Sequence, residues 1–439
     1  MSPAPKFNII IVGAGIAGLA ASIALAEKGN KVTILEAAPK LSAVGAGIQL
    51  PPNSNLVLGQ LGVYEHVAKL SSKPKSIVLK RWLDGSLITQ TPLEPDIEQS
   101  YGKPYLLIHR ADLLQVLLDK AYEVGVEIRL DTYVSTMNEA EPSVTLSGGQ
   151  TLGAELIIGA DGLKSRVRKV VLEGKDVEIR FSSSCVYRTL IPAAAMRENS
   201  ALQSLLDEPV AMYWVGPKAH VIGYPISNGD VYNFVLCDSS TPPVGLISKV
   251  VPLAELQSRF RDWEPTVRQL IDLVPEALKW QLSEIEEQPT WVSKSGKVVV
   301  IGDASHAMVP HLAQGAAMAL EDAAAMAACV EQASDLRDLP TAMARFQEIR
   351  RARCYHIQRE ASELGETWHL SDGPAQQGRD EKMHHGGRAN WVSGVESDNP
   401  NRWDDPQFQP WLFAYDAYAE ARKYLERHNY DGQNCNPER

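Results

Sequence analysis

Three glycines and one glutamate near the N-terminus have the spacing of a dinucleotide-binding turn. Gly13, Gly15 and Gly18 follow one apolar run, and Glu36 follows a second. In such a turn the first glycine permits the bend, the second lets the backbone approach a pyrophosphate, and the third lets the helix pack on the strand. An acid at the position of Glu36 accepts hydrogen bonds from a ribose. The segment predicts a strand, a helix over residues 16–27 and a bound dinucleotide.

Two more acids stand directly after apolar runs. Asp161 and Asp303 each follow a short run of strand-forming residues. In α/β folds ligands bind beyond the carboxyl ends of parallel strands, so both carboxylates are expected beside one ligand. Gly315 and Ala316 lie at the start of an alanine-rich helix expected over residues 314–331. The N–H groups at that helix end are suited to stabilising an anion.

The composition is that of a soluble enzyme. The chain has 439 residues, enough for two or three domains, and a formal charge of −11, which disfavours an extended nucleic-acid surface. Its apolar stretches are shorter than the ~20 residues of a membrane span, so no membrane contact is expected. The five cysteines are dispersed and lack a C-x-x-C pair. They indicate a reducing compartment, and hence a cytoplasmic protein without disulfides or a zinc site.

Taken together, these segments resemble the FAD-dependent aromatic hydroxylases, which are single-component class A flavoprotein monooxygenases. The resemblance covers roughly residues 7–370 and is strongest to the salicylate hydroxylase-like and 6-hydroxynicotinate 3-monooxygenase-like branch, so a fungal source is expected. It is carried further by Gly45–Asn53, by Tyr187-Arg188 and by His220–Pro225. Gln49 departs from relatives that have histidine there, which argues against transferring the hydroxynicotinate substrate directly.

The expected fold class is α/β. A Rossmann-like FAD-binding domain is interrupted by an inserted, mostly antiparallel β-sheet domain for the substrate, and a helical or extended C-terminal region follows. This prediction depends on the β-rich runs between the segment around Asp161, the second acidic segment, and the segment around Asp303, the third. The expected boundaries are residues 1–75, 105–180 and 290–370 for the FAD-binding domain, 76–104 and 181–289 for the substrate domain, and 371–439 for an aromatic-containing extension. That extension is expected to wrap the body or a second subunit, with a contribution to the substrate site as the alternative.

The resemblance implies which residues hold FAD. Asp161 is expected to touch both the FAD phosphate and the nicotinamide donor, and Arg110 the flavin phosphate or ribityl oxygens, unless it is a surface charge of its helix. Arg166 and Arg168 are either cofactor contacts or ordinary solvated charges. The complete set of expected cofactor-binding residues is Gly13, Gly15, Gly18, Glu36, Ala46, Gly47, Arg110, Asp161, Asp303, Gly315 and Ala316.

The resemblance also implies a catalytic set of Arg188, Tyr224 and His220. Arg188 is expected to bind a substrate carboxylate or phenolate, with a structural salt bridge as the alternative. Tyr224 and His220 are four residues apart on one strand and therefore share a face, either toward the substrate or packed beneath the pocket. The remaining pocket residues are expected to be Gln49, Tyr187 and Pro310. No metal is expected, because the spacing of His306 and His311 matches no known zinc or iron pattern.

The implied function is hydroxylation of a small phenolic or aromatic-acid substrate by O2, through a flavin C4a-hydroperoxide. NADH or NADPH is the expected reductant, and hydroxylation with decarboxylation is included where the substrate has an ortho carboxylate. Two alternatives stand beside this function. One is epoxidation or oxidative dearomatisation of a secondary metabolite on the same fold, and the other is a non-catalytic FAD- or NAD-binding sensor. A homodimer is compatible with the sequence.

Overall fold

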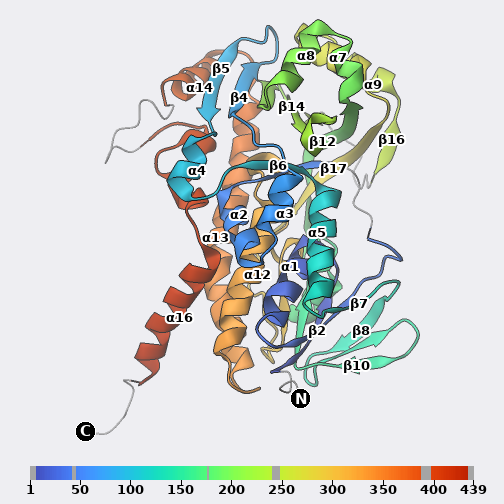
Figure 1. Ribbon diagram of the computed structural model, residues 1–439, viewed down its shortest axis with the longest axis vertical. Coiled ribbons are helices and arrows are strands. Elements are labelled where there is room, and N and C mark those ends of the chain that lie inside the picture. Colours follow the sequence, from blue (N-terminus) through green and yellow to red (C-terminus); the bar gives the residue numbers. More distant parts are fainter. Residues whose placement is uncertain (1–5, 42–45, 176, 240–247, 387–396, 434–439) are drawn as a thin grey trace.

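A parallel five-stranded sheet forms the centre of one half of the folded molecule, the lower half in Figure 1, which combines segments from both ends of the sequence. The computed structural model describes residues 6–41, 46–175, 177–239, 248–386 and 397–433. The strand order is β18 (Val298–Val300), β11 (Leu156–Gly159), β1 (Asn8–Val12), β2 (Lys31–Leu35) and β7 (Glu127–Arg129). The strands β18, β11, β1 and β2 are mostly apolar and buried, as expected where both faces of a sheet are covered, whereas the edge strand β7 is polar and partly exposed.

Helices pack on this sheet and on one another. The long apolar helix α12 contacts α1, and α1 also contacts α5. Small side chains allow the close approach, since α12 contains seven alanines among its buried residues. The helices of this half are α1 (Ile16–Ala26), α2 (Pro52–Gln60), α3 (Tyr64–Lys69), α4 (Asp96–Tyr101), α5 (Arg110–Glu123), α6 (Arg166–Val171), α11 (Asp303–His306), the short η2 (Pro310–Leu312) and α12 (Gly315–Gln332).

Two small sheets accompany the parallel one. The strands β8 (Val134–Asn138), β9 (Ser143–Leu146) and β10 (Thr151–Gly153) form an antiparallel meander at the lower edge of Figure 1. The strands β3 (Gly47–Leu50) and β6 (Leu106–His109) form an antiparallel pair, with Gln49 opposite Leu107. This pair lies between the parallel sheet and the second half of the molecule.

An eight-stranded sheet forms the second half. Its strands β13 and β4 run parallel, and its other neighbours are antiparallel. The order is β16 (Lys249–Val251), β17 (Ala277–Ile285), β12 (Ile179–Pro192), β15 (Val231–Asp238), β14 (Ala219–Ile226), β13 (Ala211–Gly216), β4 (Ser76–Arg81) and β5 (Leu87–Pro92). The outer face packs on α7 (Ala193–Arg197), α8 (Ser200–Asp207), α9 (Leu253–Arg259) and α10 (Pro265–Asp272), and η1 (Ser227–Gly229) joins β14 to β15.

The C-terminal region is helical and packs on the body. The helices are α13 (Leu339–Trp368), α14 (Pro374–His385), α15 (Phe408–Phe413) and α16 (Ala417–Gln433), with η4 (Arg402–Asp404) between them. Trp403 and Phe413 are fully buried, as expected of a wrapping extension. His384 and His385 are the last residues of α14. Trp391 lies outside the described residues.

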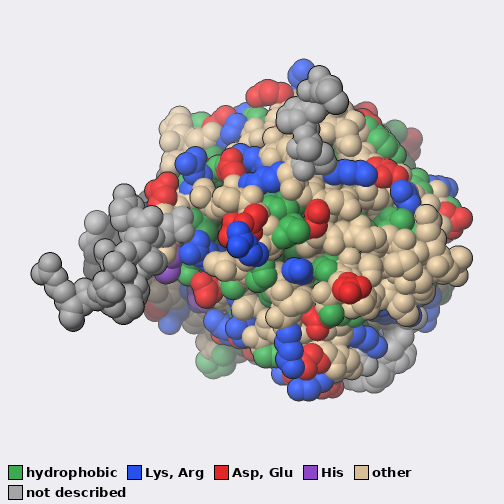
Figure 2. All heavy atoms as spheres, turned by 90° about the horizontal axis from the view of Figure 1, so that it is seen from below, with side chains coloured by type: hydrophobic (Ala, Val, Ile, Leu, Met, Phe, Trp, Pro, Cys, Tyr) green, Lys and Arg blue, Asp and Glu red, His purple; other side chains and the backbone are tan. Residues whose placement is uncertain are grey.

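The predicted α/β fold class is confirmed. A Rossmann-like half is joined to a mostly antiparallel sheet and followed by a helical extension. No helix in the described part of the chain is long and apolar enough to cross a membrane. The face seen from below in Figure 2 carries acidic and basic side chains interspersed, so that face offers no extended basic surface.

Candidate active site

The first glycine turn has the geometry that a pyrophosphate requires. Gly13 has a φ of +105°, and a Cβ there would lie 2.4 Å from the carbonyl oxygen of Ala160. A Cβ on Gly18 would lie 2.0 Å from the carbonyl oxygen of Gly13. At Gly15, in contrast, nothing lies within 4 Å of the Cβ position. Gly13 and Gly18 are therefore required by packing, whereas Gly15 leaves open space at the N-terminus of α1 for a ligand.

A cavity of about 440 Å³ opens in front of this turn. Glu36 lies at its wall, where one carboxylate oxygen accepts from Ala14 N at 2.8 Å and the other from Ala38 N at 2.8 Å. These bonds fix the carboxylate while leaving lone pairs for ribose hydroxyls. The cavity fits the adenosine part of FAD. Its walls are formed by Val12, Gly13, Gly15, Leu35, Glu36, Ala37, Thr132, Tyr133, Val134, Met137, Ala160, Asp161, Gly162, Lys164, Arg166 and Val167.

Asp161 lies at this cavity and also holds the start of α6. Its Oδ2 accepts from the backbone N–H groups of Arg166 at 2.7 Å and Val167 at 3.2 Å. Arg166 is exposed at the cavity wall. The alternative that Arg168 is a solvated charge is wrong, because its side chain is buried. It donates to the carbonyl oxygens of Leu163 at 2.7 Å and Ala304 at 3.1 Å, which ties the second acidic segment to the third.

The third acidic segment lies at the C-terminal end of β18, as predicted. Asp303 is exposed there and begins α11. Pro310 is also exposed, at the start of the separate short helix η2. Gly315 and Ala316 are half-buried in the first turn of α12, which has no side-chain cap. The N–H groups of this turn are thus available to an anionic or electron-rich group.

A charged cluster, made of His306, Glu321, Asp322, Arg350 and Arg353, supports this segment from behind. Arg350 donates to Asp322 Oδ1 at 2.9 Å and to Glu321 Oε2 at 2.7 Å, and Arg353 binds both oxygens of Glu321. Asp322 Oδ2 also accepts from Gly302 N and pairs with His306 Nε2 at 2.7 Å. All five side chains are buried, and both carboxylates have their charged partners within the cluster.

A line of interacting charges connects the third segment to the large sheet. Arg110 lies close enough to Asp303 for the carboxylate to raise its pKa, although burial lowers that pKa more. Burial lowers the pKa of Arg188, and Tyr224 partly opposes this effect. The nearby charge of Arg110 lowers the pKa of Arg188 further. Arg188 and Tyr224 therefore lie on the face of the sheet that is turned toward the FAD-binding half.

Strand pairing shows how this sheet face is built. Side chains alternate between the faces of a strand, so Arg188 and its neighbour Tyr187 point in opposite directions. Tyr187 packs in the outer core, where its hydroxyl donates to Glu255 Oε1 at 3.0 Å. The prediction that Tyr187 lines the pocket is wrong for this reason. Arg188 is half-buried, stacks 4.6 Å from the ring of Trp280, and its Nε is buried without a hydrogen-bond partner.

Gln49 is the centre of a tyrosine cluster made of Gln49, Tyr105, Tyr213 and Tyr224. Its Nε2 donates to the Tyr213 hydroxyl at 2.6 Å, and the Tyr105 hydroxyl donates to its Oε1 at 2.6 Å. Burial raises the pKa of Tyr224, an effect that Arg188 and a hydrogen bond with Gln49 partly oppose. The position of Gln49 at the pocket was predicted, but its tyrosine partners were not.

Gly47 and Ala46 join this face to the cofactor side. Gly47 N donates to Asn233 Oδ1 at 2.7 Å, and a Cβ on Gly47 would lie 2.7 Å from atoms of Asn233 and Tyr224. Ala46 O accepts from Arg110 N at 2.9 Å. Sequence reasoning missed Asn233, because its cross-strand position beside Tyr224 is visible only once the register is known.

His220 belongs to a different group of side chains from Tyr224. We call it the histidine cluster: His220, His311 and His369. His220 Nδ1 shares a hydrogen bond with His369 Nε2 at 2.7 Å, and the rings of His220 and His311 lie 5.1 Å apart. His369 follows α13 and carried no signal in the sequence beyond its residue type.

The C-terminal extension closes the sheet face. Trp403 packs on Tyr213 with ring centroids 5.2 Å apart and on Trp368 at 5.6 Å. Asn401 donates to Thr91 Oγ1 on β5 at 3.0 Å. The extension thus covers the polar face of the sheet through the tyrosine cluster rather than standing apart from it.

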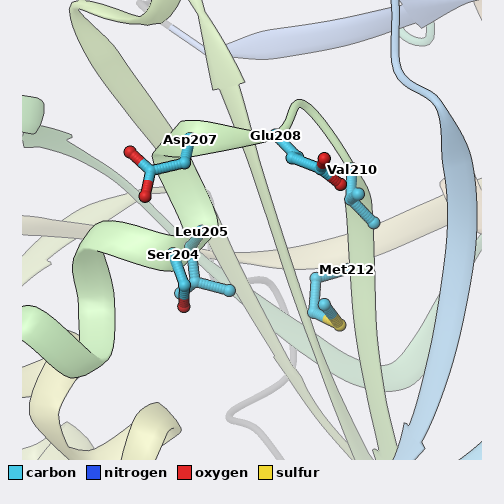
Figure 3. A pocket seen from close by; sticks show the side chains of 6 residues that line it. All are labelled: Ser204, Leu205, Asp207, Glu208, Val210 and Met212. Atoms are coloured by element: carbon cyan, nitrogen blue, oxygen red, sulfur yellow. The ribbon is translucent and has the colours of Figure 1, made fainter.

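A second hollow, of about 320 Å³, lies on the outer side of the same sheet (Figure 3). Its wall includes Met212, which points away from the tyrosine cluster because its neighbour Tyr213 faces inward. This hollow is therefore separate from the site. Its lining residues are Ser204, Leu205, Asp207, Glu208, Val210 and Met212.

Comparison with known proteins agrees with this geometry. The FAD binding domain family matches residues 6–244. FAD-dependent monooxygenase OpS4 of Beauveria bassiana is 31% identical over 418 residues, covering 94% of this chain and 96% of its own. The 3-amino-4-hydroxybenzoate 2-monooxygenase of Streptomyces cremeus is 34% identical, covering 86% and 91%. A salicylate hydroxylase substrate complex superposes with a TM-score of 0.76 at 25% identity, covering 96% and 98%.

The matches extend over both halves of the chain and include the glycine turn and both acidic segments. The residues of the first turn fit FAD, since the cavity, the open space at Gly15 and the fixed carboxylate of Glu36 are all present. This chain therefore belongs to the FAD-dependent class A flavoprotein monooxygenases, the family of the aromatic hydroxylases.

Proposed function

We propose that the protein uses NADH or NADPH to insert one oxygen atom of O2 into a small phenolic or aromatic-acid substrate. The names of two similar proteins specify an aminohydroxybenzoate monooxygenase and a salicylate hydroxylase. Both names denote a ring that bears a carboxylate and a hydroxyl. An anionic hydroxybenzoate-type ring is therefore the substrate class that we propose.

The chain's own residues would hold FAD at both ends. Glu36 and the glycine turn would bind the ribose and pyrophosphate, while Arg110, Asp303 and the first turn of α12 would bind the flavin part. Bound FAD supplies the chemistry of nicotinamide oxidation and O2 activation. The contribution of the protein is to orient the ring, to exclude water and to hold the substrate in its reactive ionisation state.

Arg188 carries the proposal. Its Nε is buried without a hydrogen-bond partner, and burial lowers its pKa. A half-buried guanidinium with an unsatisfied Nε is costly, and an anionic substrate would supply the missing charge and acceptor. Because Arg188 also interacts with Arg110, the anion would lie between the large sheet and the FAD-binding half.

Tyr224 would position the ring hydroxyl of the substrate. Burial raises the pKa of this tyrosine, so it is protonated at neutral pH and donates a hydrogen bond. Donation to a substrate oxygen favours the anionic form of that oxygen, which makes the ring more electron-rich. Gln49, anchored by Tyr105 and Tyr213, would hold this arrangement.

The compartment and assembly remain proposals. The cysteines within the described residues are all free and buried, which is consistent with the reducing, cytoplasmic environment that the sequence predicts. Homodimer formation stays a prediction of the sequence.

The test is substrate-stimulated oxidation of NADH or NADPH by the FAD-loaded protein under ¹⁸O2. Monohydroxybenzoates should stimulate O2 consumption, and the product should gain one ¹⁸O, with loss of CO2 where an ortho carboxylate is replaced. A folded, FAD-loaded protein that oxidises neither nicotinamide with any hydroxybenzoate would contradict the proposal and favour the sensor alternative.

Arg188→Met, compared with Arg180→Met as a control on the same strand, tests the anion site. Arg180 is exposed and paired with Glu286, so its loss should leave the kinetics unchanged. Arg188→Met should raise the KM for the anionic substrate by roughly 10–100-fold, the scale of a lost charge-assisted hydrogen bond of ~1.5–3 kcal/mol. FAD content should stay at the level of the parent protein. An unchanged KM would show that Arg188 does not bind the substrate.

A further inference from the structure

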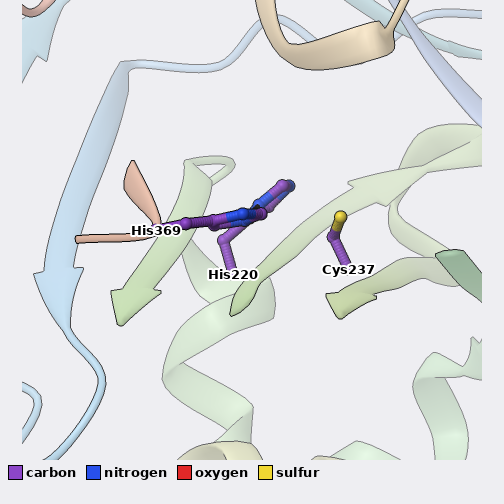
Figure 4. Close-up of side chains that lie close together, drawn as sticks. All are labelled: His220, Cys237 and His369. Atoms are coloured by element: carbon purple, nitrogen blue, oxygen red, sulfur yellow. Dashed lines mark hydrogen bonds between the residues drawn. The ribbon is translucent and has the colours of Figure 1, made fainter. Parts of the chain in front are cut away.

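Three side chains with metal-ligating atoms meet where the large sheet contacts the end of α13. His220 on β14 and Cys237 on β15 are directly paired across the two strands, and His369 follows the last turn of α13 (Figure 4). Their ligand atoms all lie within 4.8 Å of one another. Two imidazoles and a thiol converging from separate elements form a soft donor set of the kind that zinc and cobalt ions select.

The surroundings hold one of these imidazoles in a definite orientation. Ser239 Oγ lies 2.8 Å from His369 Nδ1 and 2.7 Å from Ser184 Oγ. When Nδ1 of His369 donates to Ser239, its Nε2 is unprotonated and its lone pair points toward His220. This is the outer hydrogen bond that metal-ligating histidines make, because it fixes the tautomer and the ring plane.

A third imidazole lies beside the site. His311 is 6% exposed, and its Nδ1 is buried without a hydrogen-bond partner. Its ring centroid is 5.1 Å from that of His220 and 6.2 Å from that of His369. His311 therefore places a further imidazole nitrogen beside the site, which an ion could use as an additional ligand.

Electrostatics favour a cation at this group over the other buried group of similar composition. His306, Asp322 and Cys354 also lie together, but the Arg350 guanidinium already binds Asp322 at 2.9 Å and neutralises it. The donor atoms of His220 and His369, in contrast, are hydrogen-bonded to each other and to the Ser239 hydroxyl.

We propose that His220, Cys237 and His369 bind one Zn²⁺ ion per chain. The ion would replace the hydrogen bond between the two imidazoles, which requires His220 Nδ1 to pass its proton to Nε2, and would displace the thiol proton of Cys237. One divalent ion would thus bind with release of one proton and no change of oxidation state. Bound zinc would clamp the end of α13, and with it the start of the C-terminal extension, to the large sheet.

The experiment uses the FAD-loaded protein after treatment with a chelator. Co²⁺ is the probe, because tetrahedral cobalt has visible d–d bands at wavelengths longer than those that FAD absorbs. We expect one equivalent of Co²⁺ to bind with such bands, and Zn²⁺ to bleach them by displacement. Zinc should also raise the melting temperature of the protein. No uptake of Co²⁺, or uptake with only the weak bands of octahedral cobalt, would overturn the proposal.

Variants assign the ligands. Cys237→Ser and His369→Ala should each lower the affinity for Co²⁺ by more than the ~10–100-fold that loss of an outer hydrogen-bond partner costs, whereas Ser239→Ala should fall within that range. Cys329→Ser, in α12, is the matched control for a buried thiol and should bind normally. If one variant does not fold, the other ligand variant gives the answer. Unchanged bands in a folded Cys237→Ser protein would contradict the proposal.

The proposal stands independently of the oxygenase function. Metal binding is measured by cobalt absorption and melting temperature, and neither reading depends on NADH oxidation or on a substrate. Surface histidines provide a final check: replacing His384 and His385, at the exposed end of α14, should leave cobalt binding intact. Loss of the bands in that double variant would place the ion elsewhere and overturn the assignment.

Discussion

The molecule contains two buried polar regions, and they stabilise polar groups away from water in different ways. Behind the third acidic segment, the charged cluster balances two carboxylates against two guanidinium groups and His306. On the sheet face, the tyrosine cluster and the histidine cluster use neutral groups joined by hydrogen bonds. Both regions are shielded from water, yet only the first holds paired charges.

The difference separates scaffold from ligand site. A buried ion network in which both carboxylates are already paired has little capacity for another cation, and it fixes the backbone at Gly302, whose N–H donates to Asp322. The sheet face leaves several polar atoms without partners, among them the Nε of the charged Arg188, His311 Nδ1 and Asn233 Nδ2, whereas among the five side chains of the charged cluster only His306 Nδ1 has none. Open polar atoms next to a sheet face are what a substrate or an ion can use.

The two regions should also respond to pH with opposite sign. In the charged cluster, burial alone would lower the pKa of His306, but Cys354 and Asp322 raise it well above its usual value. His306 thus contributes stability below about pH 6.5 that is lost as the pH rises through its raised pKa. In the histidine cluster burial lowers the pKa values, so stability is lost as the pH falls below about 6.5.

Arg350→Met should give the largest effect, because it leaves Asp322 and part of Glu321 buried without their partner. Removal of one member of a buried ion network typically costs ~3–5 kcal/mol. Unfolding in urea, followed by tryptophan fluorescence, would measure the loss in unfolding free energy. The matched control is Arg337→Met, which removes an ion pair of an exposed side chain and should leave the midpoint unchanged. Equal midpoints for both variants would show that the charged cluster is not the scaffold described above.

Tyr213→Phe should have a smaller effect, on the neutral side. It removes the acceptor of Gln49 Nε2 and leaves a buried donor unsatisfied, at a cost of ~1–3 kcal/mol. Tyr232→Phe is the control, because the Tyr232 hydroxyl is buried without a partner and its removal should be neutral or stabilising. Urea unfolding of both variants tests this contrast. The assignment of the tyrosine cluster as a hydrogen-bonded unit would fail if the Tyr232 variant were the less stable of the two.

His311→Leu should have the smallest effect at pH 7 and a distinct one in acid. In the parent protein the pKa of His311 is lowered to about 3, below the ~6.5 of an unfolded chain, so the unfolded state binds the extra proton as the pH falls. Removing His311 should therefore flatten the decline of unfolding free energy between about pH 6.5 and 3, by up to ~1.4 kcal/mol per pH unit. Parallel curves for variant and parent would mean that His311 is not held neutral by the fold.

The cofactor side could be predicted from the sequence to a large extent. The strand, turn and helix around Gly13, Gly15 and Gly18 were expected in the order in which they occur, and helix α1 ends within a residue of its predicted bound. The reason is that this site is local: consecutive backbone groups make the turn, and Glu36 comes from the next strand. Asp161 and Asp303 were placed by the same logic, since both end strands of one parallel sheet.

The sheet face could be predicted only in part. Arg188 and Tyr224 were both predicted to face the substrate, and they lie close enough to interact. Tyr187 was placed on the wrong face, and His220 was grouped with Tyr224 although it bonds to His369. Asn233, Tyr105, Tyr213 and His369 were not singled out. Each joins the face through a cross-strand pair or through a helix end that lies far away in the sequence.

The sequence by itself therefore determined the cofactor turn, the family and the fold class, because these depend on residues that are close along the chain. The tertiary structure alone decided which polar groups are charged and which are neutral. That outcome depends on burial and on partners such as Arg350 with Asp322, or His369 with His220, which are separated by 28 and 149 positions. No local pattern carries such pairings, since burial and long-range partners come into being only when the sheets and helices pack together.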